Sequence, residues 1–172
     1  MNTAYICYQF GKPLLSWKNK YLKYVTKRHA VRQGLYERTL REISEYTGEA
    51  VEVVRKKHRQ GPENEKGYGQ FHDSAVLSAD AVNSFYQECS FYQYELPLWN
   101  AEVGRPLYLS MLCQPYLRRY RYQKVLDFGG GTGDFSIELA QAGCDVSYCD
   151  ICKKNYDFAQ WRFKKRGLTV KM

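Results

Sequence analysis

The chain has 172 residues, of which 44% are hydrophobic and 16% aromatic, a composition that favours a folded globular protein and excludes a disordered one. Its six cysteines lack the spacing of a disulfide scaffold, and no apolar run is long enough to cross a membrane. We therefore expect a soluble, cytoplasmic protein with reduced cysteines.

Residues 1–60 are predicted to form a bundle of basic helices. They hold 13 Lys and Arg against 5 Asp and Glu, which accounts for the whole net charge of +8. In residues 14–33, apolar side chains recur at helical spacing along one stripe, namely Leu14, Trp17, Tyr21 and Val25. Such a helix either packs on its own domain with a solvated cationic face, or contacts an anionic membrane surface or the phosphates of RNA.

Two further helices are expected at residues 35–46 and 49–60, with Thr47 as the N-cap of the second. Residues 61–73 are polar and rich in glycine, so we interpret them as a hinge. His72 lies at the end of this hinge beside an aspartate. Adjacency in sequence rarely gives catalytic geometry, so His72 is only an alternative candidate for a general base.

Residues 74–120 are predicted to be helices rich in aromatic side chains. Within residues 78–96 one face carries Phe85, Cys89, Tyr92 and Leu96. Pro97 is expected to end this helix. A further helix is expected at residues 105–120, where Pro115 should kink or restart it.

Residues 121–172 follow the pattern of a parallel α/β unit. A short apolar strand at residues 125–128 runs into a turn formed by Gly129, Gly130, Gly131 and Gly133. The helix that follows should stop at Gly143, and a second strand at residues 146–149 ends in Asp150. Another helix should stop at Gly167, before a third strand at residues 168–172.

The predicted fold class is therefore α/β, a Rossmann-like parallel sheet with its first three strands only, preceded by an α-helical N-terminal region. The domain boundary is expected between residues 1–120 and 121–172. Cys149 and Cys152 form a Cys-x-x-Cys pair, but no second pair completes a set of four metal ligands, so we expect no metal and interpret both as packing residues.

The glycine turn fits one cofactor better than its main alternative. A dinucleotide fingerprint, Gly-x-Gly-x-x-Gly, would place Asp134 at its third glycine when counted from Gly129, or Ser136 when counted from Gly131. Carboxylates repel the phosphates of a dinucleotide but attract a sulfonium cation and an ammonium group. The acidic residues near the turn therefore favour S-adenosylmethionine.

The same residues resemble the first motif of the class I S-adenosylmethionine-dependent methyltransferases, an apolar strand and an acidic residue followed by Gly-x-Gly-x-Gly. The matching positions are Asp127, Gly129, Gly131 and Gly133, with Gly130 inside the same loop. The resemblance implies that the loop lies against the methionine part of the cofactor. It also implies that Asp150 holds the ribose and that Ile151 packs on the adenine, although Ile151 is equally well explained as a core residue.

The resemblance implies methyl transfer without a catalytic metal, most simply to a small molecule such as a lipid, sugar or metabolite. Two alternatives remain open: an RNA methyltransferase that uses the basic helices, and an interaction module without catalysis. Residues 74–120 would form a lid over the cofactor, and Tyr86, Tyr92 or Tyr94 would face its sulfonium. The catalytic residues are not identified by the sequence.

A complete sheet of that family has about seven strands, with the first one central. Here residues 125–128 would form an exposed apolar edge, which soluble proteins usually avoid. We therefore expect either a truncated chain or a partner chain that completes the sheet.

Overall fold

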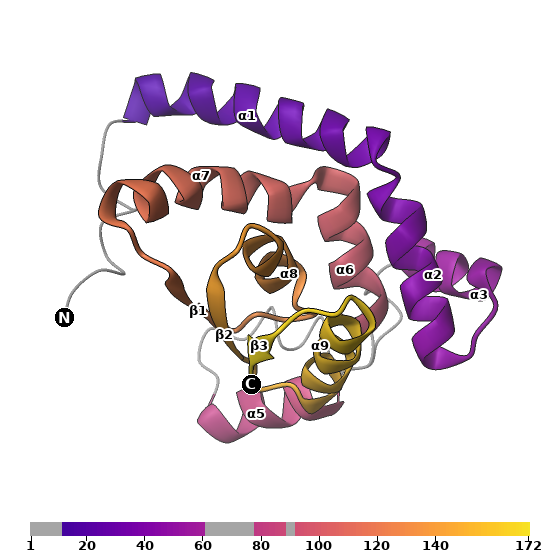
Figure 1. Ribbon diagram of the computed structural model, residues 1–172. Coiled ribbons are helices and arrows are strands. Elements are labelled where there is room, and N and C mark those ends of the chain that lie inside the picture. Colours follow the sequence, from indigo (N-terminus) through magenta and orange to yellow (C-terminus); the bar gives the residue numbers. More distant parts are fainter. Residues whose placement is uncertain (1–11, 61–77, 89–91) are drawn as a thin grey trace.

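The computed structural model describes residues 12–60, 78–88 and 92–172. Helices surround a small parallel sheet, and the long first helix lies across the helices that lead into that sheet (Figure 1). The predicted hinge, His72 and Cys89 lie outside the described residues, as do the side chains of Leu14 and Trp17. Among the described helices, none combines the length and apolar character that a membrane span requires.

The three basic helices are present as α1 (Lys12–Arg32), α2 (Leu35–Thr47) and α3 (Val51–Gln60). Gly48 ends α2 in the left-handed conformation, with φ at 73°. The prediction that Thr47 caps α3 is wrong. Its hydroxyl donates to the Ile43 carbonyl at 2.8 Å and accepts the Glu49 amide at 3.3 Å, so it closes the last turn of α2 and the turn that follows, before α3 begins at Val51.

Helix α1 packs through small residues, and of the predicted apolar stripe Val25 is half-buried but Tyr21 is exposed. Tyr21 is 61% exposed, whereas Thr26 and Ala30 are each only 1% exposed. A Cβ atom on Gly104 would lie 2.7 Å from the Thr26 carbonyl oxygen, which shows how closely the two backbones approach. The stripe is wrong at Tyr21 because a close helix crossing needs small side chains at the contact, and hydrophobicity does not mark those positions.

The aromatic segment forms α5 (Ala79–Glu88), α6 (Tyr92–Val103) and α7 (Arg105–Tyr120). The prediction that Pro97 ends its helix is wrong, because α6 continues through it. Pro115 does not restart the following helix, since α7 runs through it as one element. Pro97 removes one helical hydrogen bond, and burial of Leu98 and its neighbours compensates for that loss. Helix α6 ends at Gly104, whose φ is 68°.

Three parallel strands are present in the order β1 (Lys124–Phe128), β2 (Asp145–Cys149) and β3 (Val170–Lys171). Their register pairs Val125 with Val146 and Val146 with Val170. The connecting helices are α8 (Asp134–Gln141) and α9 (Lys153–Lys165). The chain is thus a mixed α/β protein, and these predicted elements are confirmed. Strand β3 is shorter than predicted.

The hydrophobic core joins the helices that precede β1 in the chain, here called the front helices, to the sheet region. One buried cluster contains Leu40, Ile43, Val54, Leu98 and Phe158, from α2, α3, α6 and α9. A second contains Ile137, Tyr148, Ala159 and Phe163, under the sheet. The first cluster therefore spans the boundary expected after residue 120.

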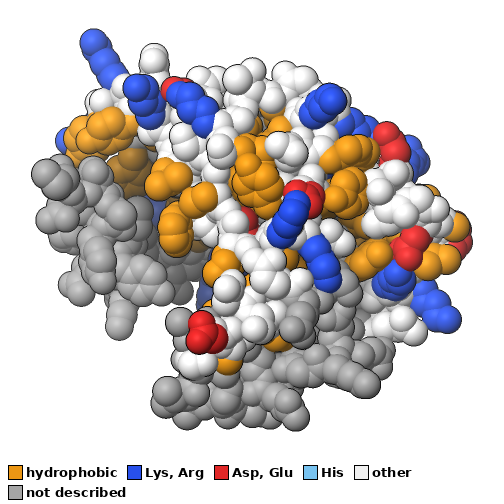
Figure 2. Space-filling view, turned by 90° about the horizontal axis from the view of Figure 1, so that it is seen from below, with side chains coloured by type: hydrophobic (Ala, Val, Ile, Leu, Met, Phe, Trp, Pro, Cys, Tyr) orange, Lys and Arg blue, Asp and Glu red, His pale blue; other side chains and the backbone are white. Residues whose placement is uncertain are grey.

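The edge strand β1 carries exposed apolar side chains, as expected. Leu126 is 63% and Phe128 is 84% exposed. On the face of the molecule seen from below, hydrophobic side chains lie interspersed with lysines and arginines (Figure 2). This face therefore combines apolar and cationic groups.

Candidate functional site

The glycine loop, residues 129–133, leaves the carboxyl end of β1 and leads into α8. Gly129, Gly131 and Gly133 have φ values of 69°, 56° and 77°, which other residues adopt only with strain. The amides of Gly129 and Gly130 donate to the Cys149 carbonyl at 2.9 and 3.1 Å. The loop is therefore hydrogen-bonded to the end of β2. It lies at the carboxyl ends of the strands, where ligands of parallel α/β folds bind.

Asp150 is brought to this loop, as predicted, but its carboxylate also has a structural role. One oxygen accepts the Gly131 amide at 2.7 Å and the other accepts the Cys152 amide at 2.8 Å. Each carboxylate oxygen has a second lone pair for another donor. Ile151 is 54% exposed, so the alternative that it is a core residue is wrong.

Asp127 lies in β1, two residues before the loop, and its carboxylate lines the cavity beside the loop. The Ser136 hydroxyl donates to its Oδ2 at 2.7 Å. Burial raises the pKa of the Asp127 carboxyl above its usual range, and the nearby carboxylates of Asp134 and Asp150 also raise it, against the hydrogen bonds from Ser136. A cation beside Asp127 would relieve this cost.

Close packing explains two of the glycines. A Cβ atom on Gly130 would lie 2.6 Å from the Tyr148 ring and 2.9 Å from Asp127 Oδ2. A Cβ atom on Gly133 would lie 2.8 Å from the Phe163 ring. The Tyr148 hydroxyl also donates to the Gly131 carbonyl at 2.5 Å, so the side of the loop that faces the protein is filled.

A buried ionic network lies behind the loop and was not predicted. Arg162, which is 2% exposed, donates to the Thr132 carbonyl and to Asp134 Oδ1, both at 2.7 Å. Its Nε donates to Glu42 Oε2 at 3.0 Å, and Arg166 donates to the other oxygen of Glu42 at 2.8 Å. The network therefore connects α2 in the front helices to the loop and to the first turn of α8.

This network changes the interpretation of Asp134. Its Oδ2 accepts the Thr132 hydroxyl at 2.6 Å and the Asn100 amide at 3.1 Å, while Arg162 occupies Oδ1. The argument that Asp134 presents a free negative charge to a ligand is wrong, because its charge is compensated within the protein. Any preference for a cationic ligand depends on Asp127 and Asp150.

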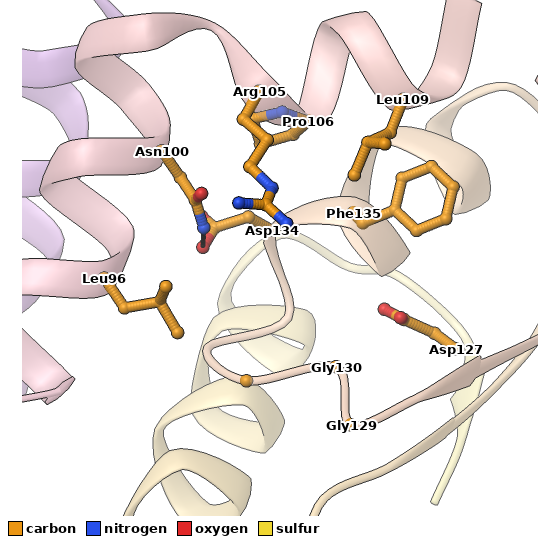
Figure 3. Close-up of a pocket in the computed structure, with 11 residues that line it drawn as sticks. Leu96, Asn100, Arg105, Pro106, Leu109, Asp127, Gly129, Gly130, Asp134 and Phe135 are labelled. Atoms are coloured by element: carbon orange, nitrogen blue, oxygen red, sulfur yellow. Dashed lines mark hydrogen bonds between the residues drawn. The ribbon is translucent and has the colours of Figure 1, made fainter. Parts of the chain in front are cut away.

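A cavity of about 250 Å³ opens beside the loop. Its walls come from the loop, from Asp127 and from α6, α7 and α8 (Figure 3). Asn100 projects into it from α6 and Arg105 from the start of α7. The Asn100 Oδ1 atom is buried and accepts no hydrogen bond from the described residues. Sequence reasoning missed Asn100 because Pro97 was taken to end the helix that carries it.

The predicted lid tyrosines are not among the described residues that line this cavity. Tyr86 and Tyr92 stack on each other, with ring centroids 5.9 Å apart. Tyr94 is engaged by Lys57, whose Nζ lies 4.5 Å from its ring centroid and 3.2 Å from its hydroxyl. Tyr94 therefore already has a cation on its face.

Cys149 and Cys152 flank Asp150 at the end of β2. The Cys149 thiol lies 3.9 Å from the Asp127 carbonyl oxygen. Cys152 is fully buried at the start of α9, and its amide is one of the two that donate to Asp150. The pair thus contributes to the packing beneath the loop.

Comparison of the chain with profiles of protein families, with curated proteins and with solved structures found no match.

Proposed function

We propose that the glycine loop binds S-adenosylmethionine and that the protein transfers its methyl group to a small-molecule acceptor. The observation that carries the proposal is the loop itself. Three left-handed glycines follow β1, next to the half-buried Asp127 and beside a cavity of about 250 Å³. Bare backbone next to a carboxylate suits a cationic ligand better than a phosphate.

The cavity side chains complement the α-amino acid end of this cofactor. Asn100 Oδ1 is an acceptor without a described donor, which suits an ammonium group. Arg105 supplies a guanidinium beside Asn100, at the start of α7, which suits a carboxylate. An acceptor and a donor from two residues that line one cavity fit a zwitterion.

The adenosyl part would extend toward the end of β2. The Asp150 oxygens keep lone pairs for ribose hydroxyls, and the exposed Ile151 offers an apolar surface for the adenine. When bound, the cofactor supplies an electrophilic methyl group. The residues of the chain hold and orient it and exclude water, and a proton acceptor is needed only for an acceptor molecule that must lose a proton.

Isothermal titration calorimetry with S-adenosylmethionine, S-adenosylhomocysteine and NAD⁺ tests the proposal. We expect both adenosyl compounds to bind and NAD⁺ not to bind. Asp127→Asn should weaken binding of S-adenosylmethionine by about fivefold, and binding of the neutral thioether S-adenosylhomocysteine by less, because a carboxylate near a cation is worth about 1 kcal/mol in a hydrated site.

The matched control is Asp157→Asn on α9, which removes an exposed carboxylate that pairs with Lys153. It should leave both affinities unchanged. Tighter binding of NAD⁺ than of either adenosyl compound would refute the proposal, and so would the absence of any binding of S-adenosylmethionine.

A further inference from the structure

A second cavity, of about 550 Å³, lies between α1 and the corner where α6 meets α7. Figure 1 shows α1 running along this corner. One wall is formed by Lys23, Tyr24 and Lys27, all from α1. The other wall includes Trp99, Arg105 and Tyr108. Its volume falls within the range of about 300 to 1,000 Å³ that is typical of sites for small molecules.

The charged side chains around this cavity are all cationic. None of the described lining residues is acidic. Lys23, Lys27 and Arg105 are exposed and take part in no ion pair among the described residues, whereas the buried Arg162 and its neighbour Arg166 are both paired with carboxylates. An anion that enters the cavity therefore meets positive charge without a competing carboxylate.

Aromatic rings hold two of these cations in place. Lys23 Nζ lies 5.5 Å from the Tyr108 ring centroid, and Arg105 Cζ lies 5.4 Å from the Trp99 ring centroid. Tyr24 is 57% and Trp99 is 37% exposed, so both retain ring surface that a ligand can cover. Such walls suit a molecule with a flat apolar body and an anionic head group.

The two cavities are neighbours. Arg105 and Leu109 line both of them. A molecule in the larger cavity would therefore lie next to the place assigned above to the methyl donor. This adjacency distinguishes the cavity from a general cationic surface.

We propose that the cavity between α1 and the α6–α7 corner binds an anionic small molecule with an aromatic or apolar body, and that this molecule is the methyl acceptor. The acceptor role rests on the proposed function, whereas the binding site does not. A carboxylate and a phosphate share the required chemistry. RNA is the competing ligand, because its phosphates would also be attracted to the lysines of α1.

The experiment uses probes of one shape and different charge: 2-naphthoate, 2-naphthyl phosphate and the neutral 2-naphthamide. Calorimetry should show that at least one anion binds about tenfold more tightly than the amide, since pairing with two or three exposed cations contributes roughly 1 kcal/mol or more. The stronger of the two anions identifies the head group. Lys23→Gln/Lys27→Gln should abolish this preference.

Lys18→Gln/Lys20→Gln is the matched control. It removes the same charge from exposed positions of α1 that do not line the cavity. The preference for the anion should survive in this variant. Equal loss in both double variants would overturn the proposal, because it would indicate a diffuse cationic surface of the kind that binds RNA. Absence of any preference in the unmodified protein would overturn it as well.

Competition with S-adenosylhomocysteine separates the two proposals. If the anion still binds at saturating S-adenosylhomocysteine, the two cavities act as separate neighbouring sites, as inferred here. If S-adenosylhomocysteine displaces it, the anion sits in the glycine-loop cavity, and the assignment to α1 is overturned while cofactor binding stands. If the anion binds with the expected selectivity but no adenosyl compound binds, the proposed function fails and the acceptor role fails with it.

Discussion

Arg162 donates to Glu42 at 3.0 Å although 120 residues separate the two in sequence. Glu42 comes from α2, and Arg162 comes from α9 and also holds the Thr132 carbonyl of the glycine loop. Both side chains are buried. The shape of the loop therefore depends on a contact with the front helices.

Arg162→Met should lower the free energy of unfolding by about 3 to 5 kcal/mol, because Glu42 and Asp134 would remain as buried charges without their main partner. Urea denaturation followed by circular dichroism measures the change. Lys165→Gln, which breaks an exposed pair with Glu45 on the same helix, should cost less than about 1 kcal/mol. Similar losses in the two variants would refute the importance of the network.

The stabilisation by Glu42 should depend on pH. Burial raises the pKa of its carboxyl, but Arg162 and Arg166 outweigh burial, and the pKa lies below its usual 4.5. A lowered pKa in the folded state means that the stabilisation is complete above pH 4.5 and is lost as pH falls through the folded value. Glu42→Gln should therefore lower the unfolding free energy by about 3 kcal/mol at pH 7, and by less at pH 3.

Glu45→Gln is the control for this pH dependence, since Glu45 lies on the same helix with its side chain 60% exposed. Urea midpoints at pH 7, 5 and 3 should differ little between this variant and the unmodified protein. A cost of Glu42→Gln that stays constant down to pH 3 would contradict the sign of the pKa shift.

Gly133→Ala should destabilise the protein more than Gly129→Ala. Both glycines have positive φ, which costs an alanine about 1 to 2 kcal/mol. Only at Gly133 would the added Cβ also meet a ring, that of Phe163, at 2.8 Å, whereas no atom lies within 4 Å at Gly129. The crowding should add about 1 to 3 kcal/mol, measured by thermal or urea unfolding. Equal effects would mean that Phe163 moves aside freely.

Tyr148→Phe should loosen the loop by leaving the Gly131 carbonyl without its donor. Burial, together with the carboxylates of Asp150 and Asp127, raises the pKa of the Tyr148 phenol well above its usual 10, so it remains a donor even in mildly alkaline solution. The expected loss is about 1 to 3 kcal/mol of unfolding free energy. Tyr156→Phe serves as the control, because it removes a hydroxyl from the ring next to that of Tyr148. Equal stability of Tyr148→Phe and the unmodified protein would show that water replaces the phenol.

The strands, the glycine loop and the ends of α8 and α9 were predictable from sequence because each has a local cause. Apolar residues such as Val125 and Val146 mark strands, and Gly143 and Gly167 have the positive φ that ends a helix. Asp127 was placed near the loop because it lies within the first strand, and Asp150 because it directly follows the second. Local pattern was sufficient for this half of the site.

The rest depends on contacts between distant segments. Nothing near Glu42 or Arg162 in sequence indicates that the two form a buried pair, since both occur in helices that also carry exposed charges. The close approach of Thr26 to Gly104 likewise follows from small size and not from hydrophobicity. Asn100 was missed because Pro97, three residues before it, was expected to end the helix. Tertiary packing overrides that preference, and α6 continues.

Leu98 and Phe158 share one core cluster with residues of α2 and α3, and this constrains how segments of such a protein can be recombined. Recombination that joins a foreign set of leading helices to the segment from β1 onward would leave Phe158 facing unmatched surfaces. Functional chimaeras should therefore require that both segments come from one parent, or that α9 is exchanged together with its distant partners.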